Sequence, residues 1–247
     1  MACPPGSNRR NAAPERLAGS AGGGCRDTPG LVRGLLPRFI AVAEGEIDKT
    51  DGALWPEEAV QIARGAARRR REFVAGRVLA RRALTALGGP EAPILADEDR
   101  VPCWPGGFAG SISHSPRYAA AAVVRLGEVA GIGIDVEETG RFRVELERHI
   151  LSPAEIARHL EGREVQERTA NAAGIFSAKE AFYKAQFPVT RRRLTFHDVE
   201  VELETASGAF AVWRTVEATR RFAGRIAAGD GLVATAIWFA PGMRVEA

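Results

Sequence analysis

The sequence predicts an α+β protein made of two parts. In each part, one segment has apolar residues at the spacing of a helix, and shorter segments are apolar or alternate as strands do. No repeat of fixed period is present. A chain of 247 residues can bury a core in one large domain or two small ones without disulfides or zinc.

The beginning of the chain is expected to lie outside the folded part. Residues 1–29 are rich in Gly, Ala, Pro, Ser and Arg and show no hydrophobic period, so they cannot bury enough surface to offset the entropy of ordering. We therefore predict a disordered tail over 1–29, an N-terminal half over 30–126 and a C-terminal half over 127–247.

The pattern of the N-terminal half predicts helix followed by a hairpin. At least one long helix is expected over 56–87, because apolar residues recur at helical spacing and Gly88-Gly89-Pro90 is a stop signal. Residues 92–110 are rich in Pro and Gly and are typical of a loop. Residues 111–114 and 119–125 then resemble two strands around a turn.

The C-terminal half mixes strands and helices as well. A strand is predicted over 129–136, and a helix should begin near Pro153, where Ser152 is a good N-cap. A second helix is expected over 171–186, ended by Pro188. Three further strands are predicted, over 198–203, 209–213 and 232–239.

Composition indicates an ordinary soluble globular protein, with 45% hydrophobic and 26% charged residues. The net charge of +3 is mildly basic, and much of the excess lies in two clusters, Arg68–Arg71 and Arg191–Arg193. These clusters are consistent with an anionic partner.

The cysteines and the apolar runs bear on location. Cys3, Cys25 and Cys103 are widely spaced and form no metal-ligand set, which fits a reducing cytoplasm. No apolar run approaches the roughly 18 residues of a membrane span, and the start of the chain lacks a secretory signal. We expect a cytoplasmic monomer with no membrane partner.

Two carboxylates stand two residues apart in the motif 133–137, Gly-Ile-Asp-Val-Glu. On a strand, Asp135 and Glu137 point to one face, while Ile134 and Val136 point into the core. Two anions so close favour a cation between them, and oxygen ligands suit magnesium, which is commonly bound together with substrate phosphates. For an isolated motif of this kind, two solvated acids at a strand end are the commoner explanation.

A second charged motif lies in the predicted helix over 171–186. Glu180 and Lys184 are four apart and share a helical face, and Lys179 is next to Glu180. An exposed ion pair is the simple explanation. Three aromatic residues surround these charges, which favours a half-buried helix whose ions bind a partner: Phe176, Phe182 and Tyr183.

Two further sets of residues could bind phosphate. Ser113 and His114 are adjacent on a strand and face opposite sides, so they cannot form a Ser-His catalytic pair. His114 either donates to a phosphate or is satisfied at the strand end. An arginine stripe in the 56–87 helix binds phosphate if it faces a cleft and is a solvated face otherwise: Arg70, Arg77 and Arg81, with Arg69 beside them. Neither a P-loop nor a dinucleotide-binding glycine motif is present.

Taken in order, three segments resemble the signature blocks of the Sfp/EntD-type 4'-phosphopantetheinyl transferases: 111–115, 133–137 and 176–184. Two further stretches, 69–77 and 93–105, look like the enterobactin synthase component D subgroup. The resemblance implies a pseudo-dimer of two similar α/β halves, each an antiparallel sheet packed with a long helix, with the coenzyme between them.

This resemblance implies a reaction as well. The 4'-phosphopantetheine group of coenzyme A is transferred to a serine hydroxyl of apo acyl or peptidyl carrier proteins, and adenosine 3',5'-bisphosphate is released. Such carriers belong to fatty acid, polyketide or nonribosomal peptide synthases, so secondary metabolite or siderophore biosynthesis is an expected setting.

The site residues implied by the resemblance fall into three groups. Magnesium would be held by three carboxylates: Asp135, Glu137 and Glu180. The diphosphate would be bound by Lys179 and Lys184, and the nucleotide end by Arg69, Arg77 and His114, with Ser113 as a phosphate or pantetheine contact. Glu180 and Lys184 are the catalytic candidates, although the serine could lose its proton to Glu180, another acid or a metal-bound water.

The loop over 96–100 departs from the family pattern, since relatives often carry a lysine where this chain has Ala-Asp-Glu-Asp-Arg. We expect Arg100 to compensate as a coenzyme contact. Two rival functions are a basic nucleic-acid-binding protein and a different magnesium phosphotransferase or phosphohydrolase. The first leaves the acids unexplained and the second leaves the full motif set unexplained, so we predict no nucleic-acid partner.

Overall fold

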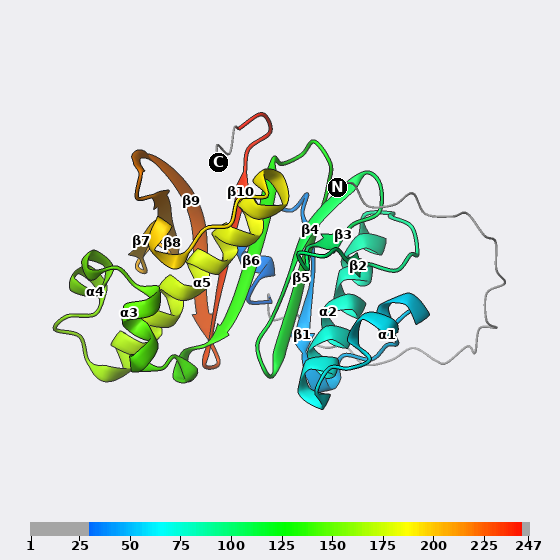
Figure 1. Cartoon of the computed structure of the whole chain (residues 1–247), viewed down its shortest axis with the longest axis horizontal. Coiled ribbons are helices and arrows are strands. Elements are labelled where there is room, and N and C mark those ends of the chain that lie inside the picture. The colour runs from blue at the N-terminus through cyan, green and yellow to red at the C-terminus, as the bar shows by residue number, and fades with distance from the viewer. Residues whose placement is uncertain (1–29, 244–247) are drawn as a thin grey trace.

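The computed structural model describes residues 30–243, which form two α+β halves side by side (Figure 1). Each half has an antiparallel sheet covered by a long helix, so the predicted fold class is confirmed. The tail predicted over 1–29 lies outside the described residues. The boundary predicted between 126 and 127 falls in the connection between β5 (Tyr118–Arg125) and β6 (Gly131–Glu138).

The N-terminal sheet has three strands in the order β1-β5-β4. Strand β4 (Phe108–His114) and β5 form the predicted hairpin, and β5 also pairs with β1 (Ala41–Glu46). The sequence did not predict β1, because only its first residues are apolar. Ala119 and Ala121 of β5 are fully buried, and their small side chains let a helix pack closely on the sheet.

Two helices occupy the segment predicted as helical: α1 (Pro56–Ile62) and α2 (Ala67–Ala86). The buried carboxylate of Glu58 ties α1 to α2 and to the following loop. It accepts hydrogen bonds from the backbone N–H of Ile94, at 2.9 Å, and from Arg81, at 2.5 Å. Arg81 is therefore used inside the fold rather than in a phosphate-binding stripe. Two short strands pair within the predicted loop: β2 (Leu95–Ala96) and β3 (Pro102–Cys103).

The C-terminal sheet has five antiparallel strands in the order β6-β10-β9-β8-β7. Its other members are β7 (Val199–Glu204), β8 (Ala209–Arg214), β9 (Glu217–Gly229) and β10 (Leu232–Phe239). The four predicted strands of this half are confirmed. The sequence missed β9, because its arginines interrupt the apolar pattern: Arg220, Arg221 and Arg225.

Between residues 127 and 243, the C-terminal half has three α-helices: α3 (Glu147–Ile150), α4 (Pro153–His159) and α5 (Val165–Thr190). The predicted start of α4 is confirmed, since the Ser152 hydroxyl accepts the backbone N–H of Glu155 and the Glu155 carboxylate accepts that of Ser152. The prediction that Pro188 ends α5 was wrong. Pro188 lies in the last turn, where its missing N–H removes one hydrogen bond, and the helix ends two residues later.

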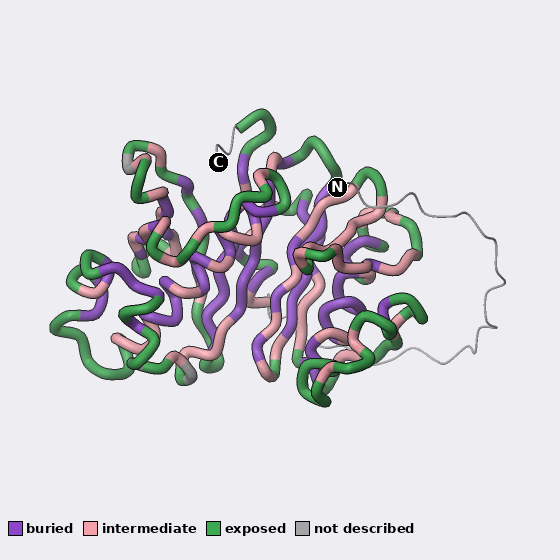
Figure 2. Tube along the Cα trace, viewed as in Figure 1, coloured by how far each residue is buried: buried purple, intermediate pink, exposed green. Residues whose placement is uncertain are grey.

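Side chains rather than a backbone ladder bridge the two sheets where β4 meets β6. The hydroxyls of Ser111 and Ser113 accept the backbone N–H groups of Ile134, at 3.1 Å, and Val136, at 3.2 Å. Both pairs are two residues apart, which matches the period of a strand on each side. Behind this seam lies a shared core, visible as the buried strands in the middle of Figure 2.

Helix α5 lies directly on β6, and Gly133 makes this contact possible. A Cβ at Gly133 would come within 1.9 Å of the Ala181 carbonyl oxygen, which is backbone and cannot move aside cheaply. The glycine of the 133–137 motif therefore sets how close the helix with Glu180 approaches the strand with Asp135.

We expect Gly133→Ala to push α5 away from β6 and to destabilise the protein by about 1–3 kcal/mol or more, as overpacking does. Urea unfolding measures the change. Gly45→Ala in β1 is the matched control, since a Cβ there meets nothing within 4 Å. Equal stability of the two variants would contradict this account of the packing.

Candidate active site

A cleft of about 750 Å³ lies between the two halves, walled by α2, β4, the β2–β3 loop and the last turns of α5. Basic side chains that the sequence analysis singled out line it together: Arg69, Arg77, Arg100, His114 and Lys184. The first and last of these residues, Arg69 and Lys184, are 115 positions apart in the sequence. The cleft thus presents a cationic wall suited to a phosphorylated ligand.

His114 is held between a cation and an anion at this wall. Arg69 Nη1 lies 2.5 Å from His114 Nε2, and Glu72 Oε2 lies 3.7 Å from His114 Nδ1. Because a guanidinium can only donate, Nε2 accepts and Nδ1 carries the proton. Burial, together with the charges of Arg69 and Lys184, lowers the pKa of His114 to about 4. The ring is therefore neutral at physiological pH.

Arg77 is the most deeply buried cation of this wall, at 6% exposure. Burial lowers its pKa to about 10, and its guanidinium lies 4.3 Å from the centre of the Phe73 ring. Its Nε has no hydrogen-bond partner in the part of the chain that the structure describes. A buried donor without an acceptor is costly, so an anionic ligand in the cleft would compensate it.

Asp135 forms the centre of a second group of polar side chains. Its Oδ1 accepts hydrogen bonds from the Ser113 hydroxyl, at 2.8 Å, and from Lys184 Nζ, at 2.6 Å. Lys184 Nζ also lies 3.1 Å from Ser113 Oγ. The second oxygen, Asp135 Oδ2, is buried without a partner among residues 30–243. This oxygen is available to a cation.

Glu137 and Glu180 complete this acidic group. Burial, followed by the charge of Asp135, raises the pKa of Glu137 to about 8. Burial also raises the pKa of Glu180, with Asp135 adding to the effect and Lys184 opposing it. The pKa of Lys184 is raised despite its burial, because it faces Asp135 and Glu180. The carboxylates are close enough to repel one another.

These acids do not form a ready metal cage. Within residues 30–243, no three His, Cys, Asp or Glu side chains converge in an arrangement that holds a metal ion. The Lys184 ammonium instead supplies the positive charge at Asp135. The three-carboxylate magnesium site expected from the sequence therefore stays a prediction.

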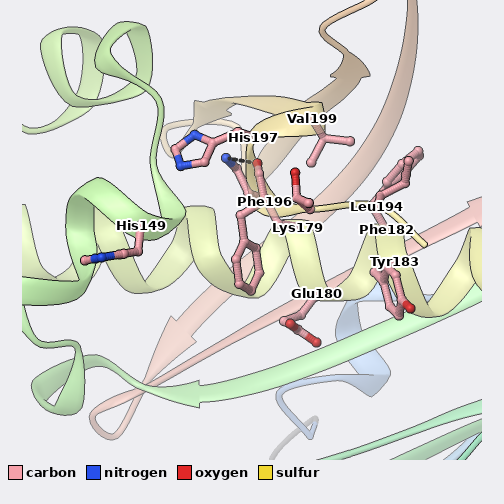
Figure 3. A pocket seen from close by; sticks show the side chains of 10 residues that line it. His149, Lys179, Glu180, Phe182, Tyr183, Leu194, Phe196, His197 and Val199 are labelled. Carbon is pink, nitrogen blue, oxygen red and sulfur yellow. Dashed lines mark hydrogen bonds between the residues drawn. The ribbon is translucent and has the colours of Figure 1, made fainter. Parts of the chain in front are cut away.

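A smaller pocket of about 270 Å³ opens on the other side of Tyr183, which also lines the cleft. Its wall is mostly apolar, with Phe182, Leu194, Phe196 and Val199 (Figure 3). The Glu180 side chain lies at its edge. The site thus combines a charged cleft with an apolar pocket, and Tyr183 stands between them.

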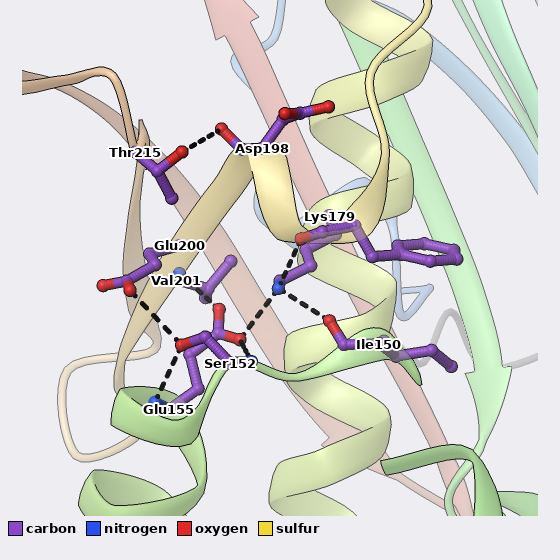
Figure 4. Close-up of polar contacts among 9 residues, drawn as sticks. Ile150, Ser152, Glu155, Lys179, Asp198, Glu200, Val201 and Thr215 are labelled. Atoms are coloured by element: carbon purple, nitrogen blue, oxygen red, sulfur yellow. Dashed lines mark hydrogen bonds and ion pairs between the residues drawn. The ribbon is translucent and has the colours of Figure 1, made fainter. Parts of the chain in front are cut away.

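Lys179 does not reach the cleft, although it is next to Glu180 in the sequence. Its ammonium donates to the carbonyl of Ile150 and the carboxylate of Glu155, each at 2.8 Å (Figure 4). It also donates to the carbonyl of Phe196, at 2.8 Å. Both side chains of the Lys179–Glu155 pair are at most 1% exposed. The interpretation of Lys179 as a diphosphate ligand does not fit this geometry, because adjacent helical residues point about 100° apart.

Known protein families match both halves. Residues 57–124 match the family model described as "4'-phosphopantetheinyl transferase N-terminal domain". Residues 131–236 match the model described as "4'-phosphopantetheinyl transferase superfamily". The chain belongs to the 4'-phosphopantetheinyl transferase superfamily. The resemblance drawn from the three sequence motifs is therefore confirmed.

Relatives of the transferase show how far the similarity extends. The 4'-phosphopantetheinyl transferase PptT of Mycobacterium tuberculosis is 40% identical and covers 79% of this chain and 84% of its own. Svp of Streptomyces mobaraensis is 35% identical, over 84% of this chain and 88% of its own. Enterobactin synthase component D of Escherichia coli K12 is 36% identical but covers only 53% of this chain and 62% of its own.

Sequence analysis did not assign four charged residues to the transferase's cleft: Arg64, Glu72, Asp97 and Asp99. Glu72 lines the cleft, is 6% exposed and faces Arg69 and His114. Its position three residues after Arg69 on a helix was a usable signal. Arg70, which the sequence placed in the same stripe as Arg77, is exposed and does not line the cleft.

The described helices also bear on the predicted relation to membranes. None of the helices in residues 30–243 has the length and apolar character needed to span a bilayer.

The lowered pKa of His114 predicts an acid-sensitive component of stability. The unfolded chain takes up a proton near pH 6.5 but the folded protein only near pH 4, so this contribution is present above pH 6.5 and is lost as the pH falls through 4. His114→Gln should reduce the loss of unfolding free energy between pH 7 and pH 5. The exposed His197→Gln is the control, and urea titrations that show identical pH dependence in both variants would refute the effect.

The buried pair predicts that Lys179→Met destabilises the protein by about 3–5 kcal/mol, because Glu155 is left buried and unpaired. Adding Glu155→Gln should recover part of that loss, since the charge is then removed. Lys49→Met, at an exposed ion pair, serves as the control and should change stability little. A wild-type melting temperature for Lys179→Met would show that the pair is not structural.

Proposed function

We propose that this transferase moves the 4'-phosphopantetheine group of coenzyme A onto a serine hydroxyl of an apo acyl or peptidyl carrier protein. The observation that carries the proposal is the junction at Tyr183, where the cationic cleft meets the apolar pocket. Coenzyme A has the same two-part chemistry, a phosphorylated nucleotide end and an uncharged pantetheine arm. Glu180 and Lys184 lie near that junction, where the diphosphate would bind.

The two ends of the coenzyme would then have distinct partners. Arg69, Arg77 and Arg100 would bind the phosphates of the nucleotide end by charge-assisted hydrogen bonds. His114 is neutral and its Nε2 accepts from Arg69, so it orients that guanidinium for the ligand. The pantetheine arm would enter the pocket of Phe182, Leu194 and Phe196.

The donor set at Asp135 fits a magnesium ion. Asp135 Oδ2 is buried without a partner among the described residues, and burial, with the charge of Asp135 adding to it and that of Lys184 opposing it, raises the pKa values of Glu137 and Glu180. Oxygen donors of this kind suit a hard cation, and Asp135, Glu137 and Glu180 would have to move closer together to hold it, because they do not converge on one point in this structure. When bound, magnesium supplies charge stabilisation at the diphosphate during phosphoryl transfer.

The chain's own groups account for positioning and proton transfer. The carrier serine oxygen attacks the phosphorus that bears pantetheine, and the bond from this phosphorus to the bridging oxygen breaks, releasing adenosine 3',5'-bisphosphate. Lys184 Nζ, held by Asp135 and Ser113, places a cation at the diphosphate. Glu180, with a pKa raised by burial, accepts the serine proton at the mouth of the pocket.

Partner and setting follow from the same proposal. Carrier proteins of fatty acid, polyketide or nonribosomal peptide synthases are the substrates, with siderophore and other secondary metabolite pathways included. We propose that the active species is a monomer, because both sides of the cleft come from one chain. We also propose that the reaction takes place in the cytoplasm.

Purified protein with magnesium and coenzyme A should add about 340 Da to an apo carrier protein, as phosphoryl transfer of phosphopantetheine requires. Glu180→Gln and Asp135→Asn should lower transfer at least about a hundredfold, because each removes a carboxylate that would hold magnesium at the diphosphate. Glu167→Gln, on the exposed start of α5, is the control and should transfer at the wild-type rate. Intact-mass spectrometry measures the increment, and an unmodified mass across both acyl and peptidyl carriers would reject the proposal.

A further inference from the structure

Four ion-paired residues join the two halves at the rim of the cleft, and we name them the clasp: Asp97, Asp99, Arg191 and Arg193. The acids lie on the β2–β3 loop, and the arginines follow the last turn of α5. Arg191 Nη1 lies 2.7 Å from Asp97 Oδ2 and 3.5 Å from Asp99 Oδ2, and Arg193 Nη2 lies 2.5 Å from Asp99 Oδ1. The acidic loop that departs from the family pattern thus meets the second arginine cluster.

The acid side of the clasp is a closed turn. Asp97 Oδ1 accepts the backbone N–H groups of Asp99, at 3.0 Å, and Val101, at 2.8 Å, which leaves Oδ2 for Arg191. Burial alone would raise the pKa of Asp97, but the hydrogen bonds from Arg191 and Val101 hold it below its usual range. Arg100 follows in the left-handed region, at φ 66°, and lines the cleft. The clasp therefore orients the segment that carries Arg100.

The basic side is fixed by the end of α5. Arg191 adopts the left-handed conformation at φ 55°, and its backbone N–H donates to the Phe187 carbonyl. The guanidiniums of Arg191 and Arg193 each lie 5.8 Å from the centre of the Phe187 ring, which lines the cleft. Hydrogen bonding to Asp97 raises the pKa of Arg191. Both sides of the clasp are thus continuous with the cleft wall.

We propose that the clasp holds the two halves together at the rim and positions Arg100 and Phe187 for coenzyme A. This inference rests on the proposed function. Two aspartates at the rim of a cleft that binds an anion would repel it, so their charge needs a use other than ligand binding. The arginines of the opposite half neutralise the charge of these aspartates, and the resulting ion pairs connect the two halves.

A competing explanation is that Arg191 and Arg193 bind the phosphates directly and the aspartates hold them away. The two explanations predict opposite changes in the affinity for coenzyme A when the aspartates are removed. If the clasp positions the cleft, removing either the acids or the arginines weakens coenzyme binding. If the aspartates compete with phosphate, removing them strengthens it.

The test compares steady-state transfer and backbone hydrogen exchange in the full chain. For the double variant Arg191→Gln/Arg193→Gln, we expect the KM for coenzyme A to rise about two- to tenfold with kcat within about twofold, as is typical of partly exposed ion pairs. Asp97→Asn keeps the Oδ1 turn and should raise the KM as well. Exchange over 97–101 should accelerate in both variants.

Controls use the same segments. Arg192→Gln removes a positive charge between the two clasp arginines. Only the main chain of Arg192 is hydrogen-bonded to Thr190 and Gln186, and its guanidinium forms no ion pair with Asp97 or Asp99. The KM of this variant for coenzyme A should therefore match that of the wild type. The charge-swapped pair Asp99→Arg/Arg193→Asp should restore part of the loss seen with Asp99→Arg alone, because the new aspartate pairs with position 99 while Arg191 still repels it. In about 1 M salt the difference between wild type and the double variant should shrink, because exposed charges are screened.

Two results would overturn the clasp: a lower KM for Asp97→Asn, or unchanged exchange over 97–101 in the double variant. Failure of the proposed function is distinguishable from both. In that case wild-type protein neither binds coenzyme A nor modifies a carrier, while the exchange measurement still reports whether the clasp links the halves.

Discussion

The contact of Asp135 with Ser113 and Lys184 is the interaction on which the site depends. It joins β6, β4 and α5 at one point, and the three groups come from both halves of the chain. The contact requires α5 to lie against β6, which the absent side chain of Gly133 permits. It also requires β4 to run along β6, which the serine bridges to Ile134 and Val136 secure. Packing and electrostatics therefore determine the same geometry.

Two lysines of α5 show how burial separates structural from functional charges. Lys179 has three oxygen partners, and the Glu155 carboxylate that it contacts is also bonded to the backbone of Ser152 and Val201. That network is complete and has no capacity for a ligand. Around Lys184, in contrast, Asp135 Oδ2 has no hydrogen-bond partner among the described residues. Incomplete compensation is what a site that binds ions requires.

The basic wall of the cleft also has a polar group without a partner, in this case a hydrogen-bond donor of a cation. Burial lowers the pKa values of Arg77 and His114, and Arg77 Nε lacks an acceptor within residues 30–243. The cleft wall therefore has one unsatisfied donor, Arg77 Nε, and Asp135 beside Lys184 has an unsatisfied acceptor, Oδ2. A phosphorylated ligand together with a cation would satisfy both, which is consistent with phosphoryl transfer by this family. Arg191 and Arg193, which do not line the cleft, instead have partners within the protein, Asp97 and Asp99.

The sequence by itself determined the family, most of the strands and five basic residues that line the cleft: Arg69, Arg77, Arg100, His114 and Lys184. Alternation in 133–137 placed both acids on one strand face, and Ser152 with Glu155 marked a helix start, because these signals depend only on local geometry. Tertiary structure decided what local spacing cannot express. In the folded protein, Lys179 forms a buried ion pair with Glu155 and Arg81 pairs with Glu58. Glu72 lies beside His114. The tertiary structure also extended α5 past Pro188 and paired the arginine-rich β9 within the sheet. For the three charged contacts the partner is distant in the chain, so only the packing of whole elements fixes which charge is compensated and which is left for a ligand.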